Sequence, residues 1–259
     1  AGRISYHELP GFSLAEAGRS DWRRLWLRGG FPRSFLARTE SLSRNWRRDL
    51  VKTYLERELP SLDFQVPAAT MRRFWAMLAH SHGQIWNSFE FARSFGVSDK
   101  TVRNYLGILA DTFMARLLQP WHESLSKRQV KSPKVYFRDS GILHQLSGIE
   151  DFAQLQTHPR CGASWEGFAL EQTIQITGAW DDQCYFWATH QGAELDLLLV
   201  RGRKREGFEF KYSQSPGLTL SMRTALEDLK LDHLYVVHAG LKRYSLGKRV
   251  DAIPLADLG

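Results

Sequence analysis

Two apolar segments in the last third of the chain carry charged side chains at alternate positions. They are ELDLLLV at 194–200 and EGFEFKYS at 206–213. Side chains alternate between the two faces of a strand, so Glu209 and Lys211 point the same way on the second segment. If the two strands pair, we expect the face that carries Asp196 to lie beside them. The pattern predicts either a metal site that cuts nucleic acid or a solvated sheet face.

Metal-assisted phosphodiester hydrolysis is the chemistry that these residue types would support. Mg²⁺ prefers hard oxygen ligands in near-octahedral geometry and keeps several waters, so Asp196 and Glu209 are the expected ligands of Mg²⁺ or Mn²⁺. A bound divalent ion lowers the pKa of a water and neutralises charge on the phosphate, and Lys211 would be the catalytic cation. Glu166 precedes the strands and is expected to reach over them as a further carboxylate.

The elements that position these residues are predicted to form an α/β unit. The segment SWEGFALEQTIQI, 164–176, predicts a helix capped by Ser164. Strands are expected at 184–190, 193–201 and 205–213, then a helix at 220–231 and a strand at 233–240. Alternation on the second of these strands predicts two faces, with Glu194, Asp196 and Leu198 on one and Leu195, Leu197 and Leu199 on the other.

A helix-turn-helix pattern precedes this unit. The chain predicts a helix from about Ser88, a turn at Gly96 and a second helix capped by Ser98. Two β-like runs around a polar loop follow, as in a wing. The inward-facing residues of the second helix are expected to be Val102, Tyr105, Leu106 and Leu109. In a DNA-reading motif, its nucleic-acid contacts would include Lys100, Arg103 and Asn104. The near-neutral local charge leaves a spacer or protein-contact module as an equal alternative.

A run of basic residues with interleaved aromatics lies between the two patterns. Cations that neutralise phosphates supply sequence-independent affinity, and aromatic rings stack on unpaired bases. The basic residues are Lys127, Arg128, Lys131, Lys134 and Arg138, and the aromatic residues are Tyr136 and Phe137. This run predicts a nucleic-acid-binding patch, and a solvated charged face is the alternative.

Composition narrows the class of protein. The 259 residues carry a formal charge of +7, and 43% of them are hydrophobic, which excludes a disordered chain and suits an anionic partner. The two cysteines, Cys161 and Cys184, form no CxxC pair, so we expect a reducing cytoplasm. No run approaches the roughly 20 apolar residues of a membrane span, and no signal peptide is recognisable.

The order of the chemistry-bearing elements resembles a known superfamily. A helix Glu, an Asp on one strand and E-x-K on the next strand are similar to the PD-(D/E)xK nucleases. Glu166, Asp196, Glu209 and Lys211 match its four positions, and Leu195 stands where the superfamily's name has a proline. The resemblance implies a restriction-endonuclease-like domain that uses Mg²⁺ or Mn²⁺ on DNA.

Nearly the whole chain also resembles the uncharacterised C-terminal region of bacterial and archaeal AAA-type ATPases. The similar segments include YLERELPSL, ARSFGVSDKTVRNYLGILADTF, VKSPKVYFRDSGILHQL, WEGFALEQ, GAELDLLL and FEFKYS. The resemblance implies three parts in a mixed α/β chain: a helical lid and tail at 1–60, a winged helix-turn-helix at 61–125, and a nuclease-like domain at 126–259. It also implies an ATPase core in cis that this chain lacks.

The chain contains no GxxxxGK[ST] motif, which is the backbone cradle and lysine that bind nucleotide phosphates. We therefore expect ATP to bind only the missing core and expect no ATPase activity here. The sequence predicts a DNA-binding, metal-dependent nuclease, and the alternative is a non-catalytic module that binds nucleic acid or protein for the ATPase. It leaves the form of the substrate, the pathway and the oligomeric state open.

Overall fold

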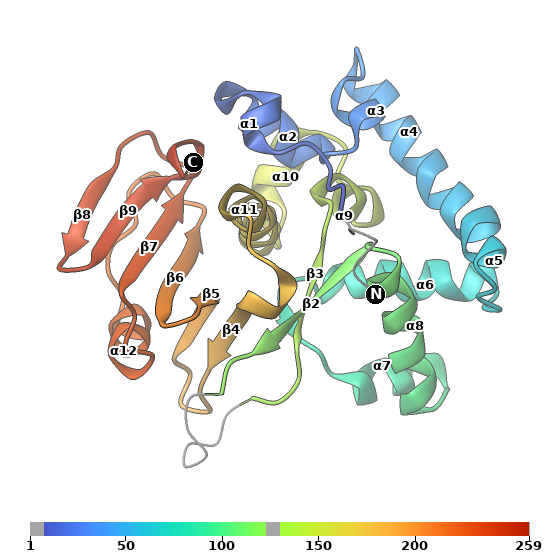
Figure 1. Cartoon of the computed structure of the whole chain (residues 1–259). Coiled ribbons are helices and arrows are strands. Elements are labelled where there is room, and N and C mark those ends of the chain that lie inside the picture. The colour runs from blue at the N-terminus through green and yellow to red at the C-terminus, as the bar shows by residue number, and fades with distance from the viewer. Residues whose placement is uncertain (1–7, 123–129, 259) are drawn as a thin grey trace, which may run out of the picture.

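A mixed sheet runs through the described part of the computed structural model, which covers residues 8–122 and 130–258. Within these residues the sheet has nine strands in the order β1-β3-β2-β4-β5-β6-β7-β9-β8 (Figure 1). The strands are β1 Gln84–Ile85, β2 Ala115–Pro120, β3 Lys134–Phe137, β4 Cys184–Ala188, β5 Glu194–Arg201, β6 Lys204–Lys211, β7 His233–His238, β8 Tyr244–Gly247 and β9 Val250–Pro254. Antiparallel pairing joins β4, β5 and β6, whereas β6, β7 and β9 are parallel. The predicted mixed α/β class is confirmed.

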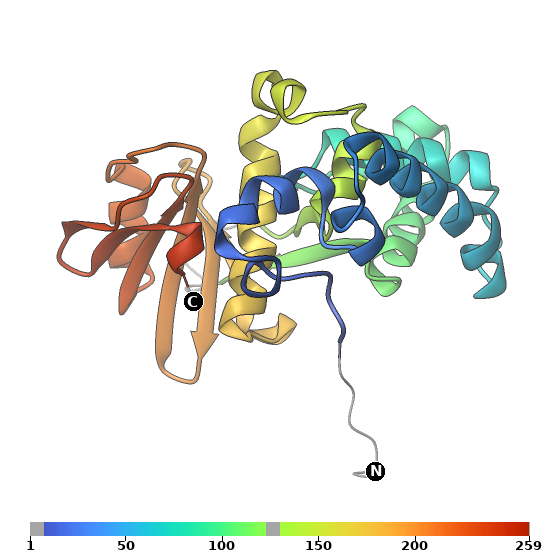
Figure 2. The same cartoon turned by 90° about the horizontal axis from the view of Figure 1, so that it is seen from above.

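Helices cover both faces of the sheet and extend beyond one end of it. They are α1 Leu14–Ala17, α2 Trp22–Arg28, α3 Pro32–Phe35, α4 Glu40–Thr53, α5 Leu59–Ser61, α6 Ala68–His80, α7 Ser88–Phe95, α8 Asp99–Asp111, α9 Ser140–Leu146, α10 Phe152–Thr157, α11 Cys161–Thr177 and α12 Leu220–Asp228. In both views α11 lies between the early helices and the C-terminal strands (Figures 1 and 2). None of the helices in the described ranges has the length and apolar character needed to cross a membrane.

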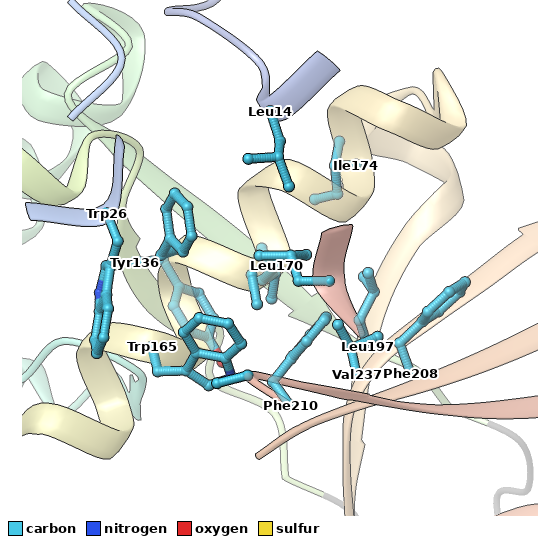
Figure 3. Close-up of a cluster of buried hydrophobic side chains, with 14 of the residues drawn as sticks. Leu14, Trp26, Tyr136, Trp165, Leu170, Ile174, Leu197, Phe208, Phe210 and Val237 are labelled. Carbon is cyan, nitrogen blue, oxygen red and sulfur yellow. The ribbon is translucent and has the colours of Figure 1, made fainter. Parts of the chain in front are cut away.

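The core around α11 joins distant parts of the sequence. Trp165 of α11 packs against Trp26 of α2, with ring centroids 5.3 Å apart. Figure 3 shows these side chains with Leu14, Leu170 and Phe210 in one buried cluster. Large aromatic side chains bury much apolar area, so this cluster stabilises the contact between the first helices and the last strands. The early helices and the C-terminal sheet thus share one core. The three-part division of the chain stays a prediction.

Helix α11 begins three residues before the predicted cap. Ser164 lies inside the helix, whose N-cap is Arg160. The Ser164 hydroxyl bonds to other elements, accepting from the Trp26 indole at 3.0 Å and lying 2.7 Å from His144 Nε2. The prediction of a Ser164 cap is therefore wrong, since a local capping signal cannot reveal that tertiary partners use the hydroxyl.

Helices α7 and α8 form the predicted helix-turn-helix pair. Gly96 ends α7 in the left-handed conformation at φ 64°, which glycine adopts without a Cβ penalty. The Ser98 side chain caps α8 by accepting the backbone N–H of Thr101 at 3.1 Å. The following β2–β3 hairpin is antiparallel, and β2 also pairs with β4. The runs predicted as a wing are therefore strands of the large sheet.

Candidate functional site

The open end of the candidate site lies where β5 and β6 meet. Lys211 Nζ is 2.9 Å from Glu209 Oε2 and 4.0 Å from Asp196 Oδ2. The Asp196 and Glu209 side chains are only 8% and 6% exposed, whereas the Lys211 side chain is 42% exposed. The lysine therefore lies on the solvent side of a buried carboxylate pair. We name Asp196, Glu209 and Lys211 the open end.

A break in strand pairing positions Asp196. The β5–β6 pairing ends at Leu197 and Phe208, and extending that register by one residue places Asp196 opposite Glu209. Beyond this point the backbone N–H of Phe210 donates to Asp196 Oδ2 at 3.0 Å. A hydrogen bond from a backbone amide fixes the carboxylate between the strands and satisfies a buried donor.

The alternation of side chains between the two faces of the sheet is interrupted near Asp196 on β5. The register between β4 and β5 shifts at a β-bulge. Leu197 and Leu199 pack in the cluster with α11, but Leu195 and Leu198 pack in the cluster with α12. The prediction that Leu195, Leu197 and Leu199 share one face is wrong, because a bulge inserts a residue and changes the alternation.

The closed end of the cluster is formed by groups from α11, β3 and the start of β5. Glu166 Oε1 accepts the Tyr136 hydroxyl at 2.5 Å and lies 3.4 Å from Lys134 Nζ. The same ammonium forms a short ion pair with Glu194 and lies 3.8 Å from Asp196 Oδ1. Asp196 therefore links the two ends, with Oδ1 toward Lys134 and Oδ2 toward Lys211. We name Glu166, Lys134, Tyr136 and Glu194 the closed end.

The buried position of Lys134 contradicts its predicted place in the basic surface patch. Its side chain is 4% exposed, so it is a partner of the carboxylates and no part of a surface that meets phosphates. Tyr136 and Phe137 are buried as well, and neither ring can stack on a base. The apolar run VYF after Lys134 forms a buried strand, which was the signal in the sequence that this segment lies inside. Glu194 is a site residue that the sequence reasoning left without a role, and Tyr136 is one that it placed in the nucleic-acid-binding patch instead.

Burial and mutual repulsion perturb the carboxyl groups at both ends. Burial raises the pKa of Glu166 to about 7, and the charge of Asp196 adds to the effect while Lys134 opposes it. Burial and then Asp196 also raise the pKa of Glu209 well above its ordinary value, against the opposing effect of Lys211. Burial is the larger cause at both carboxyl groups, and repulsion from Asp196 adds to it.

The pKa values of the two lysines are raised as well, but for a lysine this shift favours the charged form. Burial alone would lower the pKa of Lys211, but Asp196 and Glu209 outweigh it and raise the pKa above its ordinary value. Lys134 behaves in the same way, with burial opposed by its anionic neighbours, and its pKa is raised well above the usual range. Both side chains are therefore ammonium groups near neutral pH.

The donor set fits one hard divalent ion. Over residues 8–122 and 130–258, no three His, Cys, Asp or Glu side chains are placed to hold a metal ion between them. Asp196 and Glu209 provide two buried carboxylates side by side, and Mg²⁺ commonly takes one or two carboxylates and completes its shell with water and substrate phosphate. The residues thus suit a Mg²⁺ or Mn²⁺ site of that kind and do not suit an all-protein cage.

The predicted contacts on α8 are exposed. Lys100, Arg103 and Asn104 all lie on the surface of this helix. Arg103 Nε donates to Asp99 at 2.6 Å and its Nη2 donates to Ser88 at 2.9 Å. An exposed pair of this kind contributes little to stability, so the guanidinium can exchange it for a phosphate.

The other predicted basic residues have separate environments. Lys131 is exposed. Arg138 is largely buried and forms ion pairs with Glu8 and with Asp181, the latter at 3.1 Å. Lys127 and Arg128 lie outside the described residues. Within the described ranges, Lys131 is thus the member of the predicted patch that is both exposed and basic.

Comparisons with known families divide the chain at the start of α11. Residues 19–153 match the family described as Domain of unknown function (DUF8612), which covers more than half of the chain. Residues 161–258, which hold Glu166 and the open end, match the family described as Domain of unknown function (DUF4143). The chain belongs to the DUF8612 family, and the DUF4143 match follows on the C-terminal side of the DUF8612 match.

Two curated relatives are similar over almost the whole chain. They are Uncharacterized protein Rv2008c of Mycobacterium tuberculosis (strain ATCC 25618 / H37Rv) and Uncharacterized protein Mb2031c of Mycobacterium bovis (strain ATCC BAA-935 / AF2122/97). Each is 46% identical over 254 residues, which is 98% of this chain and 57% of the relative. The chain thus spans little more than half the length of these relatives. No solved structure matches it.

Proposed function

We propose that this chain is the DNA-binding, metal-dependent nuclease region of a larger protein and hydrolyses phosphodiester bonds. The observation that supports the proposal most strongly is the buried Asp196 and Glu209 pair beneath the half-exposed ammonium of Lys211. Two hard carboxylates with an accessible cation on their solvent side are suited to a phosphate that approaches from solvent.

Each residue has a distinct part in the proposed reaction. A divalent ion held by Asp196 and Glu209 would supply a more acidic water and offset charge on the phosphate. Asp196 is held in position by the Phe210 N–H. Lys211 binds a phosphate oxygen and stabilises the charge that develops during hydrolysis. Glu166 stays at the closed end, where it contacts Lys134 and lies too deep to meet the substrate first.

The larger protein is proposed to be an AAA-type ATPase whose nucleotide-binding core lies in cis. The match of residues 161–258 to DUF4143 and the greater length of the relatives support this assignment. In this proposal α7 and α8 act as a DNA-binding helix-turn-helix. Lys100, Arg103 and Asn104 would contact DNA from the exposed side of α8.

A cleavage assay with matched variants tests the nuclease. Supercoiled and linear DNA are incubated with the chain at low salt in Mg²⁺, in Mn²⁺ and in EDTA. We expect metal-dependent nicking that Asp196→Asn abolishes and Lys211→Met strongly reduces. Lys204→Met is the matched control, because Lys204 pairs with Glu206 on β6 at the same 2.9 Å but outside the cluster. Cleavage that persists in Asp196→Asn contradicts the assignment.

A non-catalytic DNA- or protein-binding module is the second candidate. It is favoured by the ion pairing of both lysines with the carboxylates, because such pairs can serve structure alone. In that case wild type and a double variant, Asp196→Ala with Lys211→Ala, would bind a DNA duplex equally and neither would cut it. Gel-shift and cleavage measurements on the same preparations separate the two candidates.

A further inference from the structure

The Lys134 ammonium fills the closed end of the cluster. Oxygens of Glu166, Glu194 and Asp196 surround its Nζ atom, the farthest at 3.8 Å. An ammonium has three N–H donors and no acceptor. It donates to Glu166 at 3.4 Å and pairs closely with Glu194, whereas Asp196 at 3.8 Å attracts it as an ion pair beyond hydrogen-bond distance. The group comes from β3, outside the region that holds the E-x-K pattern.

Apolar surfaces enclose the same side chain. The ring centroids of Tyr136 and Phe186 lie 6.0 and 5.7 Å from Lys134 Nζ. A cation placed this close to aromatic rings gains a further favourable interaction when it is shielded from water. The position of Lys134 is thus fixed by carboxylates and by packing.

Asp196 divides its two oxygens between the two ends. Oδ1 is directed to Lys134, whereas Oδ2 accepts the Phe210 N–H and lies near Lys211. Of the oxygens on the Asp196 and Glu209 side chains, Oδ2 and the carboxylate of Glu209 are therefore the ones available to a cation at the open end. These groups provide a place for one ion, and a second ion would compete with the ammonium for Oδ1.

The charges of the cluster agree with this geometry. When the four carboxyl groups of the cluster, on Glu166, Glu194, Asp196 and Glu209, are all ionised, as metal binding favours, they face two ammonium groups. Two negative charges are left over, which one divalent ion balances. A second divalent ion would make the cluster cationic and would lie beside a fixed positive charge.

We propose that Lys134 is a tethered cation that takes the place of a second metal ion, so that the cluster binds one divalent ion per chain. The proposal rests on the proposed function, because Asp196 and Glu209 are taken as the ligands of that ion. It assigns Lys134 as a positioning residue, which holds Oδ1 of Asp196 while Oδ2, beside its hydrogen bond from the Phe210 N–H, keeps a lone pair for the metal.

Counting bound Mn²⁺ by electron paramagnetic resonance tests the proposal on the intact 259-residue chain. Wild type should bind one Mn²⁺ whose signal shows no coupling to a second Mn²⁺. Lys134→Met removes the charge but keeps the side-chain length, and we expect its bound Mn²⁺ to double to two. Lys134→Arg keeps the charge and should retain one ion, as should Glu194→Gln at a half-exposed partner. Circular dichroism on each variant establishes that it is folded.

Each outcome decides the proposal. Two coupled ions in wild type overturn it, and this measurement stands even where Lys134→Met does not fold. One ion in folded Lys134→Met also overturns it. If wild type binds no Mn²⁺ while Lys134→Met binds one, the proposed metal chemistry fails and the tethered cation stands. No ion in either protein contradicts both.

Discussion

The two ends of the carboxylate cluster use the same residue types in opposite environments. Lys134 and Lys211 each approach Asp196, at 3.8 and 4.0 Å, but through different oxygens of the carboxylate. Lys134 is 4% exposed at the closed end, and Lys211 is 42% exposed at the open end. The difference indicates that access to solvent, and not the identity of the ion pair, separates a structural cation from one that can meet a substrate.

Access to water explains why similar lysine–carboxylate pairs at the two ends should have different roles. A buried charge that loses its partner cannot be rehydrated, whereas an exposed one can. The closed end should therefore dominate folding stability and the open end should dominate chemistry.

Removal of the closed-end cation should have the largest effect on stability. Lys134→Met leaves the carboxylates of Glu166 and Asp196 without a buried counter-charge, which should lower the free energy of unfolding by about 3–5 kcal/mol. The same substitution at the open end, Lys211→Met, should cost about 1 kcal/mol or less, because water reaches that site. Urea unfolding monitored by circular dichroism measures both. Equal losses in the two variants would remove the basis of the comparison.

The open end should instead control the rate. Under the nuclease proposal, Lys211→Met should reduce DNA cleavage by about 100- to 1,000-fold, as expected when a group that stabilises developing charge is lost. Its unfolding curve should stay near that of wild type. Lys204→Met on the same strand provides the matched control and should cleave normally. A decrease that Lys204→Met reproduces would point to general damage of β6.

The open end could be predicted from sequence more fully than the closed end. Its residues lie close together along the chain, and strand alternation with the E-x-K pattern brought Asp196, Glu209 and Lys211 onto neighbouring strands. The closed end depends on Lys134, which is separated from Glu166 by 32 positions and from Asp196 by more. No local sequence pattern predicts that contact. The basic run that contains Lys134 instead predicted a position on the solvated surface.

The fold shows the same limit. Helices α7 and α8 were predictable because Gly96 and Ser98 are local stop and start signals. The bulge in β5 and the start of α11 depend on tertiary partners, such as the Trp26 indole that bonds to Ser164. Hydrophobic periodicity predicts the helices and strands, but contacts between side chains of different elements decide where an element begins or bulges.

Glu166 should make stability depend on pH. Its pKa is about 7 in the folded protein and has the ordinary value of 4.5 when the chain is unfolded, so the folded state binds the extra proton between these values. Stability is therefore highest on the acidic side and is lost as the pH rises from 4.5 through about 7. The loss should reach up to about 3 kcal/mol, because one pKa unit corresponds to about 1.4 kcal/mol.

Urea unfolding in EDTA at pH 5, 6, 7 and 8 measures this dependence. Glu166→Gln removes the titrating group and should flatten the decrease, whereas the exposed Glu90→Gln of α7 should leave it unchanged. Glu209 shifts in the same direction, so part of the decrease should remain in Glu166→Gln. A profile of Glu166→Gln that follows wild type at every pH would show that the closed end does not hold this proton.

The smallest expected effect separates the hydrogen bond of the closed end from its ion pairs. The Tyr136 hydroxyl donates to Glu166 at 2.5 Å and favours the charged carboxylate, so its removal should raise the pKa of Glu166 still further. Tyr136→Phe should therefore cost about 1–2 kcal/mol above pH 8, where the carboxylate is charged, and less at pH 5. Tyr185→Phe is the control, since that hydroxyl donates to the neutral carbonyl of Asp182 near the surface, and its smaller cost should not vary with pH. If the cost of Tyr136→Phe is the same at pH 5 and pH 8, the hydroxyl does not stabilise the charged carboxylate, and Lys134 remains as the group that holds the Glu166 charge.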